Sequence, residues 1–299
     1  MSLVRTFLVW CGCLLALALP CAARDTKTPP TTLDLRVASY NAWLMPFFSK
    51  AYEERRKKLP GALRGLKADV LCLQEVWSGA DQGTLASTLA KDLPHAHRCV
   101  GGLLLLSKYE IASATFTRFP EDEALPMRER IAGKGWLDAT LKTSIGAVRV
   151  VTSHLAAMPH ADSPRSRQLT ALLTHLDKDK QAPTILAADL NMPALRNGQP
   201  GVDWRRLGTH GFVDLNAPTR KADGTWRDGA LTWYRWPRTN TRGYRRDYLC
   251  LRSSERIRVE VRTFRQALDD AETALSDHNA QVADLRLRVV TPKPKRAAR

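Results

Sequence analysis

Side chains of the types that carry hydrolytic chemistry recur at the ends of apolar, strand-like segments. They are Asn41 after LRVASY, Gln74 and Glu75 after DVLCL, Ser153 and His154 after VRVVT, Asp189 and Asn191 around the end of TILAA, Asp247 before YLCLR, and Ser276, Asp277 and His278 before NAQVADL. Each alone has an ordinary structural explanation, since Asp-x-Asn often forms a turn and Asp-His can cap a helix. Taken together, they supply the components of one active site.

The chemistry that these residue types suit is hydrolysis of a phosphate ester. Carboxylate and amide oxygens are the hard ligands that Mg²⁺ or Mn²⁺ prefers. The sequence has no His-x-x-x-His or Cys-x-x-Cys spacing of the kind that zinc favours. Histidines beside carboxylates add proton transfer and phosphate binding. A divalent ion with acid–base histidines is equipped to direct water at phosphorus.

The elements that must position these side chains are short apolar runs bounded by polar or turn residues. Their length and alternation predict strands at 35–41, 69–76, 101–107, 135–142, 148–155, 184–191, 246–252, 259–264 and 280–287. Leucines at helical spacing predict helices at 50–66, 83–93 and 163–177. The last of these opens with Ser163-Pro164, a cap followed by proline in the first turn.

One domain with sheets at its centre and helices outside accounts for this order of elements. No linker divides residues 35–288, and no internal repeat is visible. Residues 121–134 and 192–202 are predicted to be polar loops, and 216–245 is a long segment rich in Arg, Trp and Gly. We expect 24–34 to be a linker and 289–299 to be a basic tail.

The N-terminal segment 1–23 reads as a secretory signal peptide. One charge, Arg5, precedes an apolar run that is too short for a bilayer span, and small residues follow near Ala23. We therefore expect cleavage near Ala23 and a secreted or periplasmic protein. A lipoprotein anchor on Cys21 is the alternative, which Pro20 disfavours.

Cysteine content and charge narrow the classes further. After residue 23 only Cys72, Cys99 and Cys250 remain, without repeated spacing, so the chain is not a disulfide scaffold. A pair such as Cys99–Cys250 stays open, whereas the apolar surroundings of Cys72 and Cys250 favour buried free thiols. The net charge of +16 attracts nucleic acid, acidic lipid and phosphate esters alike.

The polar segments in this order, YN, LQEVW, SHL, ADLN, RDYL and SDH, resemble the motif series of the endonuclease/exonuclease/phosphatase superfamily. Each motif alone is weak, but the ordered set spans residues 35–288. The resemblance implies an α/β fold, a four-layer αββα sandwich of two packed mixed β-sheets flanked by helices. It also implies that Glu75 binds Mg²⁺ (or Mn²⁺), with Asn41 and Asp277 as partners of the metal or its water.

The same resemblance implies roles around the phosphate. Asp189 and Asn191 would position the attacking water and the phosphoryl oxygens, and His154 would contact the phosphate. His278 would act as general base or phosphate donor, oriented by Asp247, since a carboxylate on the far ring nitrogen fixes the tautomer. Whether Asp189 or His278 takes the proton from water stays open.

Local features favour a lipid substrate within this superfamily. NAWLMP, ADVLCLQEVWS and GKGWLDATL are similar to segments of the neutral sphingomyelinases, and Lys134 in the last is a candidate phosphate contact. The resemblance thus implies a sphingomyelinase-like phosphodiesterase. Together with the signal peptide, we expect a secreted monomer with peripheral membrane contact. Alternatives are a nuclease, favoured by the positive charge, a sugar- or inositol-phosphate phosphatase, and a non-enzymatic phosphate-binding protein.

The apolar run after Asn41, WLMPFF, has two explanations. It either fills the core, as most apolar side chains do, or forms an apolar lip where a lipid approaches. We expect a division, with Trp43 and Leu44 inward and Phe47 and Phe48 near the surface.

Overall fold

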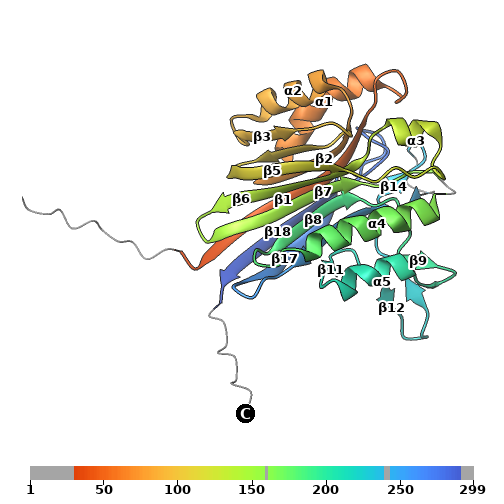
Figure 1. The fold of residues 1–299 in the computed structure, drawn as a ribbon. Coiled ribbons are helices and arrows are strands. Elements are labelled where there is room, and N and C mark those ends of the chain that lie inside the picture. Colours follow the sequence, from red (N-terminus) through yellow and green to blue (C-terminus); the bar gives the residue numbers. More distant parts are fainter. Residues whose placement is uncertain (1–29, 159–160, 239–242, 291–299) are drawn as a thin grey trace, which may run out of the picture.

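Two six-stranded β-sheets face one another in the computed structural model, which describes residues 30–158, 161–238 and 243–290 (Figure 1). The predicted signal peptide 1–23, most of the predicted linker 24–34 and residues 291–299 of the predicted tail lie outside the described residues. Among the residues that are described, no helix is both long and apolar enough to cross a membrane.

The first sheet has the strand order β17-β18-β1-β2-β4-β3. Its strands are β1 (Thr32–Leu44), β2 (Val70–Val76), β3 (His95–Arg98), β4 (Leu104–Ser107), β17 (Ile257–Ala267) and β18 (Ala280–Val289). β1 and β2 run parallel, and the other neighbours are antiparallel. The sheet is therefore mixed.

The second sheet repeats this plan in the order β11-β16-β8-β7-β6-β5. Its strands are β5 (Glu110–Arg118), β6 (Gly135–Thr143), β7 (Gly146–His154), β8 (Thr184–Asp189), β11 (Val213–Asp214) and β16 (Asp247–Arg252). Here β7 and β8 form the parallel pair between antiparallel neighbours. Each sheet thus has two parallel strands at its centre.

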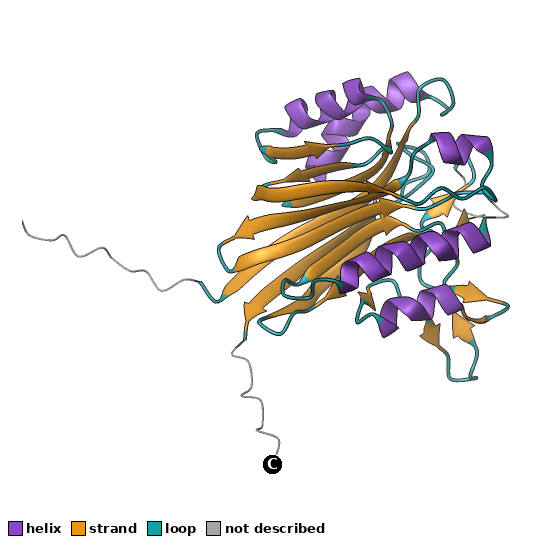
Figure 2. Cartoon of the chain, viewed as in Figure 1, coloured by secondary structure: helices purple, strands orange, loops and turns teal. Residues whose placement is uncertain are grey.

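Alternating side chains of these strands divide the apolar core into layers. On β1, Leu35 and Val37 enter the cluster between the sheets, whereas Ala38 and Tyr40 enter the cluster beneath the helices α1 (Tyr52–Gly65) and α2 (Gly79–Leu89). A third cluster lies between the second sheet and α4 (Asp162–Asp177) and α5 (Val202–Thr209). Figure 2 shows the helices on the two outer faces, which confirms the predicted four-layer sandwich.

Buried side-chain amides join the two sheets near the end at which β2 and β8 finish. Gln74 on β2 donates from Nε2 to Thr152 Oγ1 at 2.9 Å and to the carbonyl of Ala187 at 3.3 Å. Gln281 on β18 donates to the carbonyl of Asp247 at 3.1 Å. Because a buried amide left without a partner is costly, these bonds fix how one sheet lies on the other.

The structure departs from the sequence-based prediction mainly in short elements. Strands β3, β5 and β11 and helix α5 were not predicted, and the predicted loop 121–134 contains the helix α3 (Met127–Ile131). The other polar segments carry paired two-residue strands, namely β9 (Leu195–Arg196), β10 (Gln199–Pro200), β12 (Thr219–Arg220), β13 (Trp226–Arg227), β14 (Trp233–Tyr234) and β15 (Gly243–Tyr244).

The starts of β1 and α4 differ from the predicted positions, and the three described cysteines are free. β1 begins at Thr32, inside the predicted linker, because Thr32 already pairs with Arg288 of β18. Helix α4 begins at Asp162, before the predicted Ser163 cap. Cys72, Cys99 and Cys250 are all free thiols. Cys72 and Cys250 are buried, as predicted, and Cys99 is half-buried without a disulfide.

Candidate active site

Strand register brings the predicted residues to one end of the sandwich. Asn41 pairs with Gln74 across β1 and β2, so that Glu75 follows at the same edge. In the other sheet, Asp189 at the end of β8 is in register with both His154 on β7 and Asp247 on β16. The carboxyl ends of parallel strands share one edge of a sheet, which is why residues so distant in sequence meet here.

Asn41 links the carboxylates of the two sheets. Its Nδ2 donates to Glu75 Oε1 and to Asp189 Oδ2, both at 2.9 Å. Its Oδ1 accepts from the backbone N–H of Trp43 at 2.9 Å, which fixes the amide. Asn41 therefore orients two carboxylates through its nitrogen.

His278 lies beside the same carboxylates, on the loop that precedes β18. Hydrogen bonds of Ser276 hold this loop against β1. Its Nδ1 is 2.8 Å from Asp247 Oδ2, while its Nε2 lies 3.8 Å from Asp189 Oδ2. Ser276 accepts from the backbone N–H of His278 at 3.1 Å and donates to the carbonyl of Asn41 at 2.7 Å. The predicted pairing of His278 with Asp247 is present, and it leaves Nε2 as the nitrogen that faces the site.

His154 occupies the opposite side of the cluster. Its Nε2 is 3.7 Å from Asp189 Oδ2 and 3.8 Å from Glu75 Oε1. Lys134 Nζ lies 3.2 Å from that nitrogen, and because an ammonium can only donate, His154 Nε2 accepts. Burial and the charge of Lys134 hold the pKa of His154 well below its usual range, so that the ring is neutral.

Lys134 is a buried part of the site rather than a solvated loop residue. Besides His154, its Nζ contacts Glu129 Oε2 of α3 at 3.0 Å and donates to the carbonyl of Leu155 at 3.1 Å. These contacts place its charge beside His154. A direct contact with phosphate stays a prediction.

Asn191 and Asp277 complete the set that the sequence predicted. The backbone N–H of Asn191 donates to Asp189 Oδ1 at 2.9 Å, and its side chain donates to the carbonyl of Leu155 at 3.2 Å. Asp277 accepts from Trp233 Nε1 at 2.7 Å, and its other oxygen lies 3.9 Å from His278 Nε2. All nine predicted residues thus lie around one site.

Buried negative charge dominates the electrostatics. Burial and the neighbouring carboxylate of Asp247 raise the pKa of Asp189 to about 7, and burial also raises the pKa of Asp277. Burial opposes a charge on His278, but the carboxylates of Asp247, Asp277 and Asp189 outweigh it and raise the pKa of His278 to about 10. The negative charge of the site therefore favours binding of protons or of a cation.

The donor set fits a hard divalent cation. One ligand atom from each of Glu75, Asp189 and His278 lies within 4.8 Å of the others. Two carboxylates at this spacing suit Mg²⁺ or Mn²⁺. A cation would favour the ionised form of Asp189, which burial and the charge of Asp247 disfavour by raising its pKa. Glu75 and Asp189 would hold the ion. Roles for Asn41 and Asp277 at the metal or its water stay predictions.

Arg246 is a residue at this site that the sequence analysis missed. Its Nη1 donates to Asn191 Oδ1 at 3.0 Å, and its guanidinium carbon lies 4.1 Å above the ring of Trp233. Among the described residues, no carboxylate forms an ion pair with it. The only signal in the sequence is its position directly before Asp247, which the register of β16 turns into proximity.

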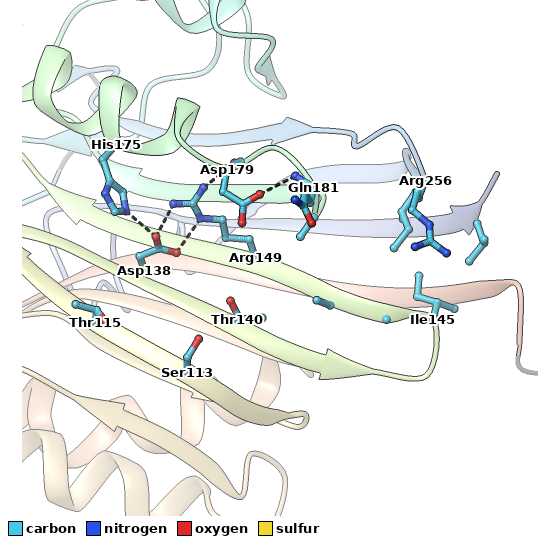
Figure 3. Close-up of a pocket in the computed structure, with 15 residues that line it drawn as sticks. Ser113, Thr115, Asp138, Thr140, Ile145, Arg149, His175, Asp179, Gln181 and Arg256 are labelled. Atoms are coloured by element: carbon cyan, nitrogen blue, oxygen red, sulfur yellow. Dashed lines mark hydrogen bonds and ion pairs between the residues drawn. The ribbon is translucent and has the colours of Figure 1, made fainter. Parts of the chain in front are cut away.

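A hollow of about 590 Å³ on the second sheet is separate from this site (Figure 3). Asp138 on its floor binds Arg149 Nη2 at 2.5 Å and His175 Nε2 at 2.7 Å. Burial opposes the charge of Asp138, but the hydrogen bonds from Arg149 and His175 lower its pKa. Asp138, Arg149 and His175 satisfy one another, so we assign these three groups a role in stabilising the fold.

The family model described as Endonuclease/Exonuclease/phosphatase family matches residues 38–278. The chain belongs to this family. Its match runs from Ala38, in the middle of β1, to His278, and so includes all nine of the predicted site residues. This confirms the resemblance that the ordered motifs indicated.

Proteins with named activities are similar to this chain in sequence. A putative neutral sphingomyelinase of Drosophila melanogaster is 24% identical over 282 residues, which cover 87% of this chain and 62% of that protein. An inositol phosphosphingolipids phospholipase C of Schizosaccharomyces pombe is 29% identical over 133 residues, covering 42% of this chain and 31% of that protein. The chain thus spans less than two thirds of the length of these relatives.

Solved structures share the fold at low identity. Sphingomyelinase C from Streptomyces griseocarneus superposes with a TM-score of 0.62 and 19% identity, covering 84% of this chain and 99% of that chain. Beta toxin from Staphylococcus aureus with bound magnesium gives 0.63 and 16%, covering 84% and 99%. D. rerio TDP2 with a single-strand DNA product gives 0.62 and 19%, covering 84% and 98%. The shared fold serves both lipid and nucleic-acid chemistry.

Proposed function

We propose that the protein is a Mg²⁺-dependent phosphodiesterase that hydrolyses sphingomyelin or a related phospholipid to release phosphocholine. The observation that carries the reaction type is the cluster in which His278, backed by Asp247, faces Asp189 beside Glu75. The similarity to a putative neutral sphingomyelinase and to a sphingomyelinase C supports the lipid substrate. We further propose that it acts as a secreted or periplasmic monomer.

The chain's own residues divide the work of attack on phosphorus. Asp247 holds Nδ1 of His278, which leaves Nε2 to exchange a proton at the phosphate. Asn41 keeps the carboxylates of Glu75 and Asp189 in place by donating to both. A bound Mg²⁺ supplies charge stabilisation of the phosphoryl oxygen and of the departing alkoxide.

Positive side chains around the carboxylates favour an anionic substrate. Lys134 contacts His154, and Arg246 donates to Asn191. Both His154 and Asn191 contact Asp189. A phosphodiester monoanion brought between Lys134 and Arg246 gains charge stabilisation that increases as the phosphorane forms. Arg246 thus contributes to catalysis in this proposal, although the sequence analysis assigned no role to this first residue of the RDYL motif.

A nuclease is the second candidate. It is supported by the net charge of +16 and by the shared fold with TDP2 in complex with a single-strand DNA product. The arginine-rich and aromatic composition of residues 216–245 suits stacked bases nearly as well as lipid head groups. Product analysis separates the two candidates.

The proposed reaction is tested by identifying the products. Purified protein with Mg²⁺ and sphingomyelin should release phosphocholine and ceramide, detected by mass spectrometry, and a chelator should stop the release. In H₂¹⁸O the label should enter phosphocholine, because water attacks phosphorus. Label in the lipid product, or free choline, contradicts the proposed bond cleavage.

Arg246→Gln should lower kcat/KM for a soluble chromogenic phosphodiester about 10²-fold, the scale for loss of one donor to a developing oxyanion. The half-buried side chain has no ion pair with the described residues, so the midpoint of thermal unfolding should change little. Arg246→Lys should recover part of the rate by keeping the charge. Arg258→Gln, on the exposed face of β17, is the matched control; rates of Arg246→Gln equal to this control would refute the role.

A further inference from the structure

The loop between β1 and α1 presents two aromatic rings to solvent. Phe47 is fully exposed at 100% and Phe48 at 78%, whereas Leu44 is buried and Trp43 is half-buried against Trp236, with ring centroids 5.5 Å apart. This is the division that the sequence predicted. Aromatic side chains normally bury their rings. Two exposed rings beside the candidate active site therefore indicate a surface that binds another molecule.

Hydrogen bonds hold the turn that exposes these two rings. Ser49 donates from its backbone N–H and from its hydroxyl to the carbonyl of Met45, at 3.0 and 2.9 Å. The buried Arg55 donates to the carbonyls of Lys50 and Trp43, both at 2.8 Å. Phe47 is held at φ 67°, a left-handed conformation that a bulky side chain adopts only when its surroundings impose it.

A second pair of exposed apolar side chains lies on α3, next to Lys134 and Glu129. Met127 and Ile131 are one helical turn apart, so they share a face, and both are exposed. Leu125 just before them turns inward and packs against Ala156. Leu125 therefore fixes this segment to the core, whereas Met127 and Ile131 face solvent.

Val100 and Tyr244 complete a set around the same end of the sandwich. Val100 lies in the loop between β3 and β4, where the neighbouring Gly101 approaches Gly133 so closely that a Cβ would lie 2.9 Å from its carbonyl oxygen. Tyr244 stacks on Trp233, whose indole donates to Asp277. We name the exposed set the docking rim: Phe47, Phe48, Val100, Met127, Ile131 and Tyr244.

The docking rim surrounds the active site rather than covering one face of the molecule. Figure 1 shows the β1–α1 loop, α3 and β14 at one end of the sheets, the end at which β1, β7 and β8 finish. Exposed cations neighbour these residues along the chain: Lys50 lies two residues after Phe48, Arg128 directly follows Met127 on α3, and Arg235 directly follows β14. Within the described part of the chain, none of these three forms an ion pair with a carboxylate.

We propose that the docking rim binds the surface of a phospholipid bilayer that contains anionic lipid and holds the active site against it. This inference rests on the proposed function, to which it adds the way the substrate is reached. Apolar side chains interspersed with unpaired Lys and Arg match the boundary between acyl chains and anionic head groups. A bilayer also contacts every loop of a ring at once while delivering its own lipid to the centre, whereas a protein seated there closes the site.

The experiment measures binding to vesicles that contain no sphingomyelin. Sedimentation is compared for phosphatidylcholine vesicles and for phosphatidylcholine–phosphatidylserine vesicles, with wild type, with Phe47→Ser/Phe48→Ser and with Val213→Ser/Val261→Ser. The last pair removes exposed apolar side chains outside the rim and is the matched control. The rim variant should bind mixed vesicles about 10- to 100-fold more weakly, as expected for two partly inserted rings, and the control should bind as wild type does.

Further readings separate docking from catalysis. Wild type should bind mixed vesicles more tightly than neutral ones, and salt should weaken that difference. The rim variant should keep its rate on a soluble chromogenic phosphodiester and lose rate on sphingomyelin vesicles. If wild type cleaves no sphingomyelin while rim-dependent binding holds, the proposed function fails and the docking stands. Equal binding by rim and control variants, or a Phe47-dependent dimer without vesicle binding, overturns the docking.

Discussion

His278→Ala should lower kcat/KM for a soluble phosphodiester by about 10³- to 10⁴-fold. The imidazole is the proton-exchanging group in the proposed mechanism, and loss of a positioned acid–base group costs a factor of this order. The variant also leaves Asp247, which is buried and bonded to Nδ1, without its partner. The loss should therefore appear in kcat and in the pH profile.

A matched control for this prediction exists in the same chain. His210 lies 2.8 Å from Asp177, the same separation as His278 from Asp247, but at the far end of the sandwich. His210→Ala removes a histidine from an aspartate pair without touching the site, so its rate should stay within about twofold of wild type, since substitutions outside a site rarely change transition-state binding. Equal rates for the two variants would mean that His278 stabilises structure only.

Glu75→Gln should abolish the response to Mg²⁺ and lower the rate on the order of 10³-fold, the scale of several kcal/mol that a bound metal contributes. The amide can still accept the hydrogen bond from Asn41, so the change removes mainly charge. Thermal unfolding followed with and without Mg²⁺ measures the metal directly. Wild type should be stabilised by the ion, and the variant should not.

The sign of the effect on the metal-free protein sharpens this test. Glu75 lies beside Asp189, and the charge of Glu75 also acts to raise the pKa of Asp277. Removing one negative charge from such a cluster relieves repulsion, so Glu75→Gln without Mg²⁺ should be no less stable than wild type. Glu260→Gln on β17 is the control. A variant that still gains stability from Mg²⁺ as wild type does would move the metal site elsewhere.

The sequence predicted the strands well because burial leaves a periodic record. In β1, Leu35 and Val37 face one core and Ala38 and Tyr40 face the other, so the run is apolar on both faces and stands out. β5 was missed because it is the edge strand, and its residues are mostly exposed or half-buried. α3 has only five residues, too few to show a helical period.

Site residues were predictable because their motifs follow one another in a recognisable order along the chain, although each residue alone has an ordinary structural explanation. His278 and Glu75 were found because ordered motifs named them, but the bonds that join them depend on how the sheets pack. The bridge from Asn41 to Asp189 spans 148 positions of sequence. Arg246 was missed for the same reason, since an arginine in a segment rich in arginine shows its partner, Asn191, only in the folded chain.

The central claim, a phosphodiesterase acting on lipid, is tested most directly by one paired assay. Purified protein with Mg²⁺ is mixed with sphingomyelin vesicles and plasmid DNA in the same tube, with a chelator and Glu75→Gln as parallel controls. We expect release of phosphocholine and intact plasmid with the wild-type protein, and no phosphocholine release in either control. Degraded plasmid beside untouched vesicles would contradict it and identify the chain as a nuclease.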